Sequence, residues 1–249
     1  MYPPGRDLPC IASGRPVVPL ERLRAGLECL VCSGLPTQIA LMFVLNAFGM
    51  RLRLADGSLS PAFVFTLSLV DAVVVISLVL FFLRAHHESP GRVLLGEGRV
   101  VREALIGIAL LPAVIAVVLI VMLLILEFAP QLHNVPRNPL EDMIRTRADA
   151  LIFAAVVMIA GGVREEIQRG FILHRFSRYL GGAAWGLVIY SVLFGMGHFE
   201  QGYDAMIATG VLGALWGLLY LTRRSIVASV VSHAGFNLAQ VLKYLVLAR

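Results

Sequence analysis

Four ionisable side chains lie in the middle of an apolar run that extends from about Ala150 to Phe176: Arg164, Glu165, Glu166 and Arg169. A helix of this length can cross a bilayer, since ~20 residues at ~1.5 Å per residue cover ~30 Å of hydrocarbon. On insertion scales each such charge costs about 2.5–3.5 kcal/mol at a helix centre. These side chains are stable there only if they face a polar cavity and pair with one another. We therefore expect the function of the protein to reside in this stretch.

The composition of the whole chain is that of a polytopic membrane protein. Of the 249 residues, 58% are hydrophobic and 15% are charged, and the mean hydropathy is +0.83. The apolar runs are continuous rather than alternating, which argues against a β-barrel. We predict an all-α membrane bundle of about seven transmembrane helices, at residues 30–50, 61–83, 104–128, 150–176, 182–198, 205–221 and 226–247.

The distribution of basic residues predicts how the chain is oriented. Residues 1–25 are rich in Arg and Pro and predict a mobile cytosolic tail, and residues 84–103 and the pair Arg223-Arg224 add positive charge on the same side. Positively charged loops stay in the cytoplasm. We predict an integral protein of the plasma membrane with a cytoplasmic N-terminus. The net charge of +5 indicates contact with anionic lipid and not with nucleic acid, because no basic helix or patch is present.

The charges divide the chain into two predicted regions. Residues 1–147 would form the tail and three transmembrane helices of uncertain role, and residues 148–249 a catalytic core of four. Asp71 is the only deep charge of the first region, and we expect it to pack or hydrogen-bond between helices. Cys29-x-x-Cys32 has no second cysteine pair to complete a zinc site, so ordinary cysteines are the better interpretation.

The first candidate cluster lies on the predicted fourth span. Glu165 and Arg169 are four residues apart and share a helix face, and Glu166 is three residues from Arg169. One arginine shared by two glutamates leaves one acid over for chemistry. Arg164 should point elsewhere, toward a water-filled edge.

Two further clusters lie on the fifth and seventh spans. His198 follows Phe194 by one helical turn, and His233 and Asn237 share a face four residues apart. A carboxylate pair, two imidazoles and an amide are the groups that water activation requires. Counted from the cytoplasmic ends, Glu165 and His233 lie ~10–16 Å deep and His198 ~24 Å, so the fifth helix must tilt or begin late. We predict that the remaining four histidines are solvated: His86, His87, His133 and His174.

These three motifs together resemble those of the CPBP family, which comprises CAAX proteases and bacteriocin-processing enzymes and is also called Abi. They are Glu165-Glu166 with Arg169, Phe194-x-x-x-His198 and His233-x-x-x-Asn237, in the family's order on separate spans. The family has three residues between the second glutamate and the arginine, whereas this chain has two. Matching on the acids makes Glu165 the first glutamate, and matching on the arginine makes it the second. We favour Glu165 as the base and Glu166 as its partner.

The resemblance implies peptide-bond hydrolysis within the membrane, at a site open to the cytoplasm. The substrate would be a membrane-associated or prenylated peptide or protein. Glu165 would activate water, His198 and His233 would position it, and Asn237 would stabilise the oxyanion. Cofactor use stays open: Glu165, His198 and His233 could also supply the three ligands of a divalent metal such as zinc, while a metal-free glutamate mechanism is equally defensible.

Two other classes of function compete with the hydrolase. A proton-coupled transporter could use Glu165 and His233 as a proton relay, although it would usually show inverted repeats or paired broken helices, and neither is visible. A catalytically silent immunity or scaffold protein would keep its function without Glu165. Intramembrane serine and aspartyl proteases are unfavoured because their motifs are absent from these spans.

Overall fold

The computed structural model describes residues 17–136, 138–144 and 146–247, with the backbone alone for 243–247. Over these ranges the chain is helical and holds no strand beyond one isolated bridge between Arg53 and Leu59. The longer helices are α1 Pro19–Val31, α2 Leu35–Ala47, α3 Pro61–Ala85, α4 Val100–Phe128, α5 Arg147–Val156, α6 Glu165–Tyr179, α7 Ala183–Met196, α8 Tyr203–Arg223 and α9 Val227–Leu247; the shorter ones are η1 Gly91–Leu95, η2 Pro130–Leu132, η3 Glu141–Met143, η4 Val157–Arg164 and η5 Phe199–Gln201.

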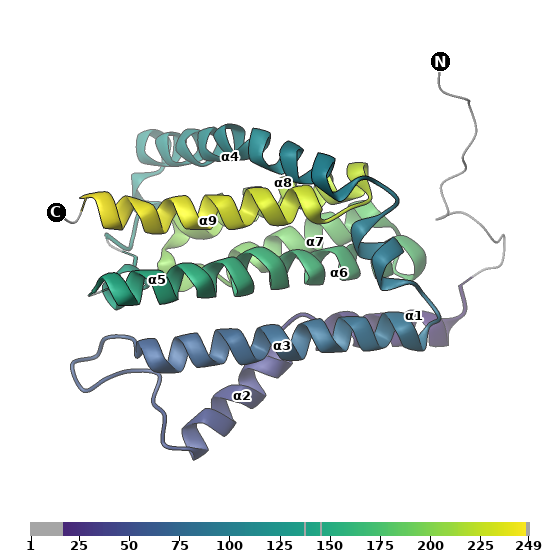
Figure 1. The fold of residues 1–249 in the computed structure, drawn as a ribbon, viewed down its shortest axis with the longest axis horizontal. Helices are drawn as coiled ribbons and strands as arrows, with labels where there is room; N and C mark the ends of the chain where they lie inside the picture. The colour runs from purple at the N-terminus through teal and green to yellow at the C-terminus, as the bar shows by residue number, and fades with distance from the viewer. Residues whose placement is uncertain (1–16, 137, 145, 248–249) are drawn as a thin grey trace.

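The helices form a membrane bundle, as the sequence predicts. In Figure 1, α4, α9, the α5–α6 helix and α3 run side by side, and α9 packs against both α4 and η4. Helices α3, α4 and α8 are each long and apolar enough to cross a bilayer, and α1 with α2 forms a possible fourth span bent by 42°. Helices α7 and α9 are apolar but shorter over their described residues. The protein is an integral membrane protein, and the count of seven spans stays a prediction.

The N-terminal region departs from the sequence prediction. The predicted tail of residues 1–25 is wrong at its end, because α1 begins at Pro19; residues 1–16 lie outside the described ranges. The predicted first span is broken between Val31 and Leu35. Gly34 adopts a left-handed conformation (φ 83°) at this break, which is open to glycine at little cost.

The predicted fourth span is a single helical rod made of α5, η4 and α6. Its middle part, η4, is a π-helix of eight residues that ends at Arg164, directly before the two glutamates. π-Helical segments are rare, and they frequently occur at functional sites. Gly162 lies within η4 where a Cβ atom would come within 2.6 Å of the Ala234 side chain on α9. The glycine therefore allows the rod and α9 to approach closely.

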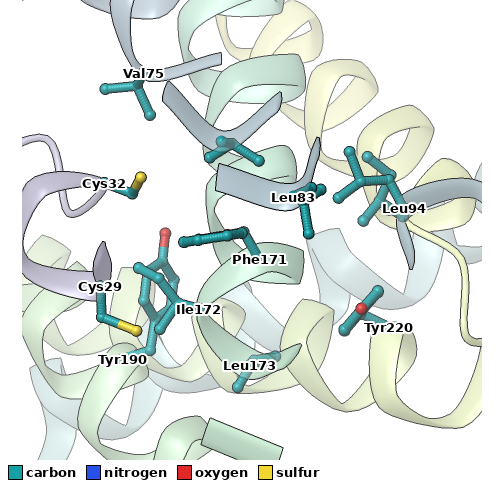
Figure 2. Close-up of a cluster of buried hydrophobic side chains, with 12 residues drawn as sticks. Cys29, Cys32, Val75, Leu83, Leu94, Phe171, Ile172, Leu173, Tyr190 and Tyr220 are labelled. Atoms are coloured by element: carbon teal, nitrogen blue, oxygen red, sulfur yellow. The ribbon is translucent and has the colours of Figure 1, made fainter. Parts of the chain in front are cut away.

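A buried apolar cluster lies beside α6 and connects it to the N-terminal helices. Figure 2 shows Phe171 and Ile172 of α6 in this cluster together with Cys29 and Cys32 of α1. Both cysteines are buried free thiols, which agrees with their interpretation as ordinary cysteines. The cluster fixes α6 in position, and α6 begins at Glu165.

Candidate active site

The buried arginine of the first cluster pairs with one glutamate only. Nη1 of Arg169 donates a hydrogen bond to Oε1 of Glu166, three residues before it, and both side chains are 0% exposed. Glu165 and Arg169 share a helix face in the sequence prediction, but they make no direct contact in the described part of the structure. In the α-helix from Glu165 onward, the i,i+3 spacing brings Glu166 to the arginine and leaves Glu165 as the free acid.

Three aromatic rings surround the guanidinium of Arg169. Its central carbon lies 5.2 Å from the ring centre of Tyr190, 4.7 Å from that of Phe194 and 5.6 Å from that of Trp216. Ring faces carry partial negative charge and attract a cation, most strongly where water is excluded. The aromatic residues therefore add to the compensation that Glu166 gives the arginine. Sequence reasoning singled out Phe194 but missed Tyr190 and Trp216, which look like ordinary members of apolar helices.

His233 is fixed in place by the same pair. Its Nδ1 lies 2.8 Å from Oε1 of Glu166, and its ring stacks on Trp216 at 3.7 Å between centres and 16° between planes. A carboxylate accepts hydrogen bonds, so the Nδ1 proton belongs to the histidine and Nε2 is the unprotonated nitrogen of the neutral ring. Glu166 thus orients His233 with its lone pair pointing away from the buried pair.

Glu165 faces that lone pair. Its Oε2 lies 3.8 Å from Nε2 of His233, and its side chain is 19% exposed, whereas that of Glu166 is fully buried. Two acceptors at this separation do not hydrogen-bond directly, but a water molecule between them could donate one hydrogen to each. The arrangement is that of a general base beside an oriented imidazole.

His198 comes from the turn after α7, and its ring shares a contact with that of His233 through Phe194. Its Nδ1 is 2.9 Å from the carbonyl oxygen of Phe194, and the rings of both His198 and His233 lie edge-on to Phe194. Helix α7 ends at Met196, so His198 sits in the turn that follows it. This turn places His198 beside Phe194.

Comparison with protein families agrees with this constellation. Residues 147–239 match the family model described as type II CAAX prenyl endopeptidase Rce1-like. This segment is therefore similar to the Rce1-like family. The matched range contains every predicted catalytic residue, from Glu165 to Asn237. Comparisons with curated proteins and with solved structures found no match.

Asn237 on α9 contacts the π-helix η4. Its Nδ2 donates to the carbonyl oxygen of Val157 at 3.3 Å, and a Cβ atom on Gly161 would come within 2.5 Å of it. An amide group has two N–H donors, so one remains for another acceptor. Gly161 therefore makes room for Asn237, whose role in stabilising an oxyanion stays a prediction.

The predicted metal set is only partly assembled in the Rce1-like domain. His233 is oriented by Glu166 as metal-ligating histidines commonly are by a carboxylate, and Glu165 lies beside its free nitrogen. However, no group of three or more His, Cys, Asp or Glu side chains in the described ranges is arranged to hold a metal ion. The Glu165, His198 and His233 set does not fit a metal as a complete set, and we derive no step through one.

Two sequence predictions about charged residues are wrong. Arg164 does not reach a water-filled edge, because its side chain is buried. Its Nη2 lies 2.5 Å from Oδ2 of Asp71, so the deep charge of Asp71 has a charged partner. Two histidines predicted to be solvated are only partly exposed and contact carboxylates, namely His86 with Glu28 and His174 with Glu88; His133 also contacts a carboxylate, that of Asp204, but is exposed as predicted. His87 is exposed as predicted. Pairing between distant helices leaves no local sequence signal, which is why these contacts were missed.

Proposed function

We propose that the protein is an intramembrane endopeptidase of the CAAX prenyl protease type, which hydrolyses a peptide bond of a membrane-associated or prenylated protein or peptide. One observation carries this proposal: a partly open Glu165 faces the free nitrogen of His233, while Glu166 holds the other nitrogen of that ring. Hydrolysis needs a general base and an oriented imidazole that contact the same water molecule.

The proposed reaction uses these groups in sequence. Water between Glu165 and His233 gives a proton to the Glu165 carboxylate as its oxygen attacks the scissile carbonyl carbon. The resulting tetrahedral oxyanion accepts a hydrogen bond from the second N–H of Asn237. Glu165 then returns the proton to the leaving amine, and the C–N bond breaks. Glu165 is again a carboxylate, and Asn237 is released from the oxyanion.

The tautomer of His198 limits what it can do in this reaction. Its Nδ1 proton is directed to the carbonyl oxygen of Phe194, so its neutral ring accepts hydrogen bonds at Nε2. We assign His198 to positioning water or the substrate rather than to the oxyanion. Arg169 and Glu166 act through His233, by fixing its orientation. We place the site in the plasma membrane, open to the cytoplasm, with a cytoplasmic N-terminus.

The test compares membrane proteomes of cells carrying the wild-type protein, Glu165→Gln and the control Glu97→Gln. Glu97 is exposed and lies outside the site. Peptide products should be present with the wild type and the control and absent with Glu165→Gln. Products that persist in Glu165→Gln would reject the proposal, and an unchanged phenotype of that variant would favour the silent scaffold.

Two further measurements separate the alternatives. Flux into liposomes that depends on a proton gradient and on Glu165 would support the transporter instead. Loss of cleavage on chelation, restored by added zinc, would show that a metal is used; unchanged cleavage would support the metal-free mechanism.

A further inference from the structure

The buried ion pair of Asp71 and Arg164 joins the N-terminal helices to the site. Asp71 comes from α3 and is 2% exposed, and Arg164 is the last residue of η4 and is 7% exposed. Their closest atoms, Oδ2 and Nη2, are 2.5 Å apart. Burying two charges costs free energy that their attraction only partly returns, so such a pair is weak evidence for a stabilising role.

The surroundings of the pair are built to hold it. Thr37 and Gln38 of α2 donate hydrogen bonds to the two oxygens of Asp71, at 2.5 Å and 3.3 Å. Gly34 leaves the space for the guanidinium, because a Cβ atom there would lie 2.0 Å from Nη2 of Arg164. Three residues of one broken helix thus serve this single pair.

Arg164 is also the residue directly before Glu165. The two side chains reach different helices: Arg164 contacts Asp71 on α3, and Oε2 of Glu165 lies 3.8 Å from Nε2 of His233 on α9. Arg169 is already paired with Glu166, so Arg164 is the other permanent cation near Glu165. An arginine side chain is long, always charged and a strong partner for any carboxylate. Without Asp71, the buried charge of Arg164 would lose this counter-charge one residue before Glu165 in the chain.

We propose that Asp71 is a positioning residue for the site: it holds the guanidinium of Arg164 away from the Glu165 carboxylate, which stays free to accept a proton from water. This inference rests on the proposed function and assigns a role to the first region of the chain. Helix α3 supplies the counter-charge of Arg164, and α2 supplies the hydrogen bonds that hold it.

The test uses the full-length protein in liposomes and a farnesylated, fluorescence-quenched peptide ending in a CAAX sequence. Asp71→Asn should lower kcat by about 10-fold or more, with KM changed less than about twofold, because the freed arginine occupies the base. The neutral double variant Asp71→Asn/Arg164→Gln should recover kcat to within about threefold of wild type. A purely structural role predicts instead that activity per folded molecule stays constant while thermal stability falls.

A second readout does not need cleavage. Carbodiimide labelling of the carboxylate of Glu165, followed by mass spectrometry, should fall in Asp71→Asn and return in the double variant. Equal labelling in wild type, single and double variants would overturn the inference, as would a double variant no more active than Asp71→Asn. If the wild type does not cleave in a Glu165-dependent way, the proposed protease fails, and the labelling series alone decides whether Asp71 keeps Arg164 from Glu165. If Asp71→Asn does not fold, Asp71→Ser takes its place with the same expected results, because it also removes the charge and keeps a hydrogen-bonding group.

Discussion

Two fully buried arginines on α6, six residues apart, sit in contrasting environments. Around Arg175, both carboxylate oxygens of Glu28 and both of Glu88 have partners: Arg175 and His86 for Glu28; Arg175, His174 and Arg178 for Glu88. Around Arg169, by contrast, Oε2 of Glu166 and two nitrogens of the arginine have no hydrogen-bond partner in the described structure, whereas around Arg175 one nitrogen, Nη2, has none.

This difference separates a structural network from a reactive site. In the Arg175 network the carboxylates are saturated and join α1, the loop after α3 and α6. In the Arg169 cluster one acid, Glu165, is left facing an imidazole at 3.8 Å. Unsatisfied buried polar groups are costly, so their concentration beside Glu165 is consistent with a place where water or substrate binds.

The sharpest way to break this comparison is to neutralise the free acid. Glu165→Gln should reduce proteolysis by about 10²–10⁴-fold, the usual contribution of a general base. Its thermal stability in detergent should stay close to that of wild type, since Glu165 is partly exposed and its ion-pair partner in the described structure, Nε2 of His233, lies 3.8 Å away. Retained proteolysis would show that Glu165 is not the base.

Removing the buried acid tests the other half of the cluster. Glu166→Ala leaves the Arg169 charge uncompensated at 0% exposure, which should cost about 3–5 kcal/mol of unfolding free energy. Glu28→Ala in the Arg175 network should also destabilise the protein, but activity per folded molecule should fall only in Glu166→Ala. Equal activity losses would remove the distinction between the two networks.

A substitution where the π-helix η4 closely approaches α9 should have a smaller effect on stability. Gly161→Ala places a methyl group 2.5 Å from Nδ2 of Asn237, closer than van der Waals contact, and overpacking of this kind costs roughly 1–3 kcal/mol. Gly26→Ala is the matched control, because a Cβ atom there meets nothing within 4 Å. Thermal unfolding of the two variants measures the difference, and equal midpoints would contradict it.

The Arg175 network should also be visible in the pH dependence of stability. Burial opposes ionisation of Glu88, but hydrogen bonds from His174 and Arg175 outweigh it and lower the pKa of Glu88 to about 2, from 4.5. Since the folded pKa is the lower one, this stabilisation is present above pH 4.5 and is lost as the pH falls toward 2. Thermal unfolding at a series of pH values measures this loss. The slope over that window should be smaller in Glu88→Gln, and an unchanged slope would show that Glu88 is not its source.

Sequence alone determined the class of fold and the residues of the candidate site. Continuous apolar runs have to become membrane helices, because backbone groups in lipid must hydrogen-bond within their own segment. Charges within such a run are rare enough to mark Glu165, Glu166 and Arg169. The motif spacing on three helices then indicated His198, His233 and Asn237 as their partners.

Only the tertiary structure decided which groups meet. Helical spacing allowed Arg169 to pair with either glutamate. In the structure both Arg169 and His233 contact Glu166, which leaves Glu165 free. Depth along the helices could not place His198, which sits in a turn. The partner of Arg164 lies 93 residues away in the sequence, and contacts over such separations depend on helix packing, which no local pattern encodes.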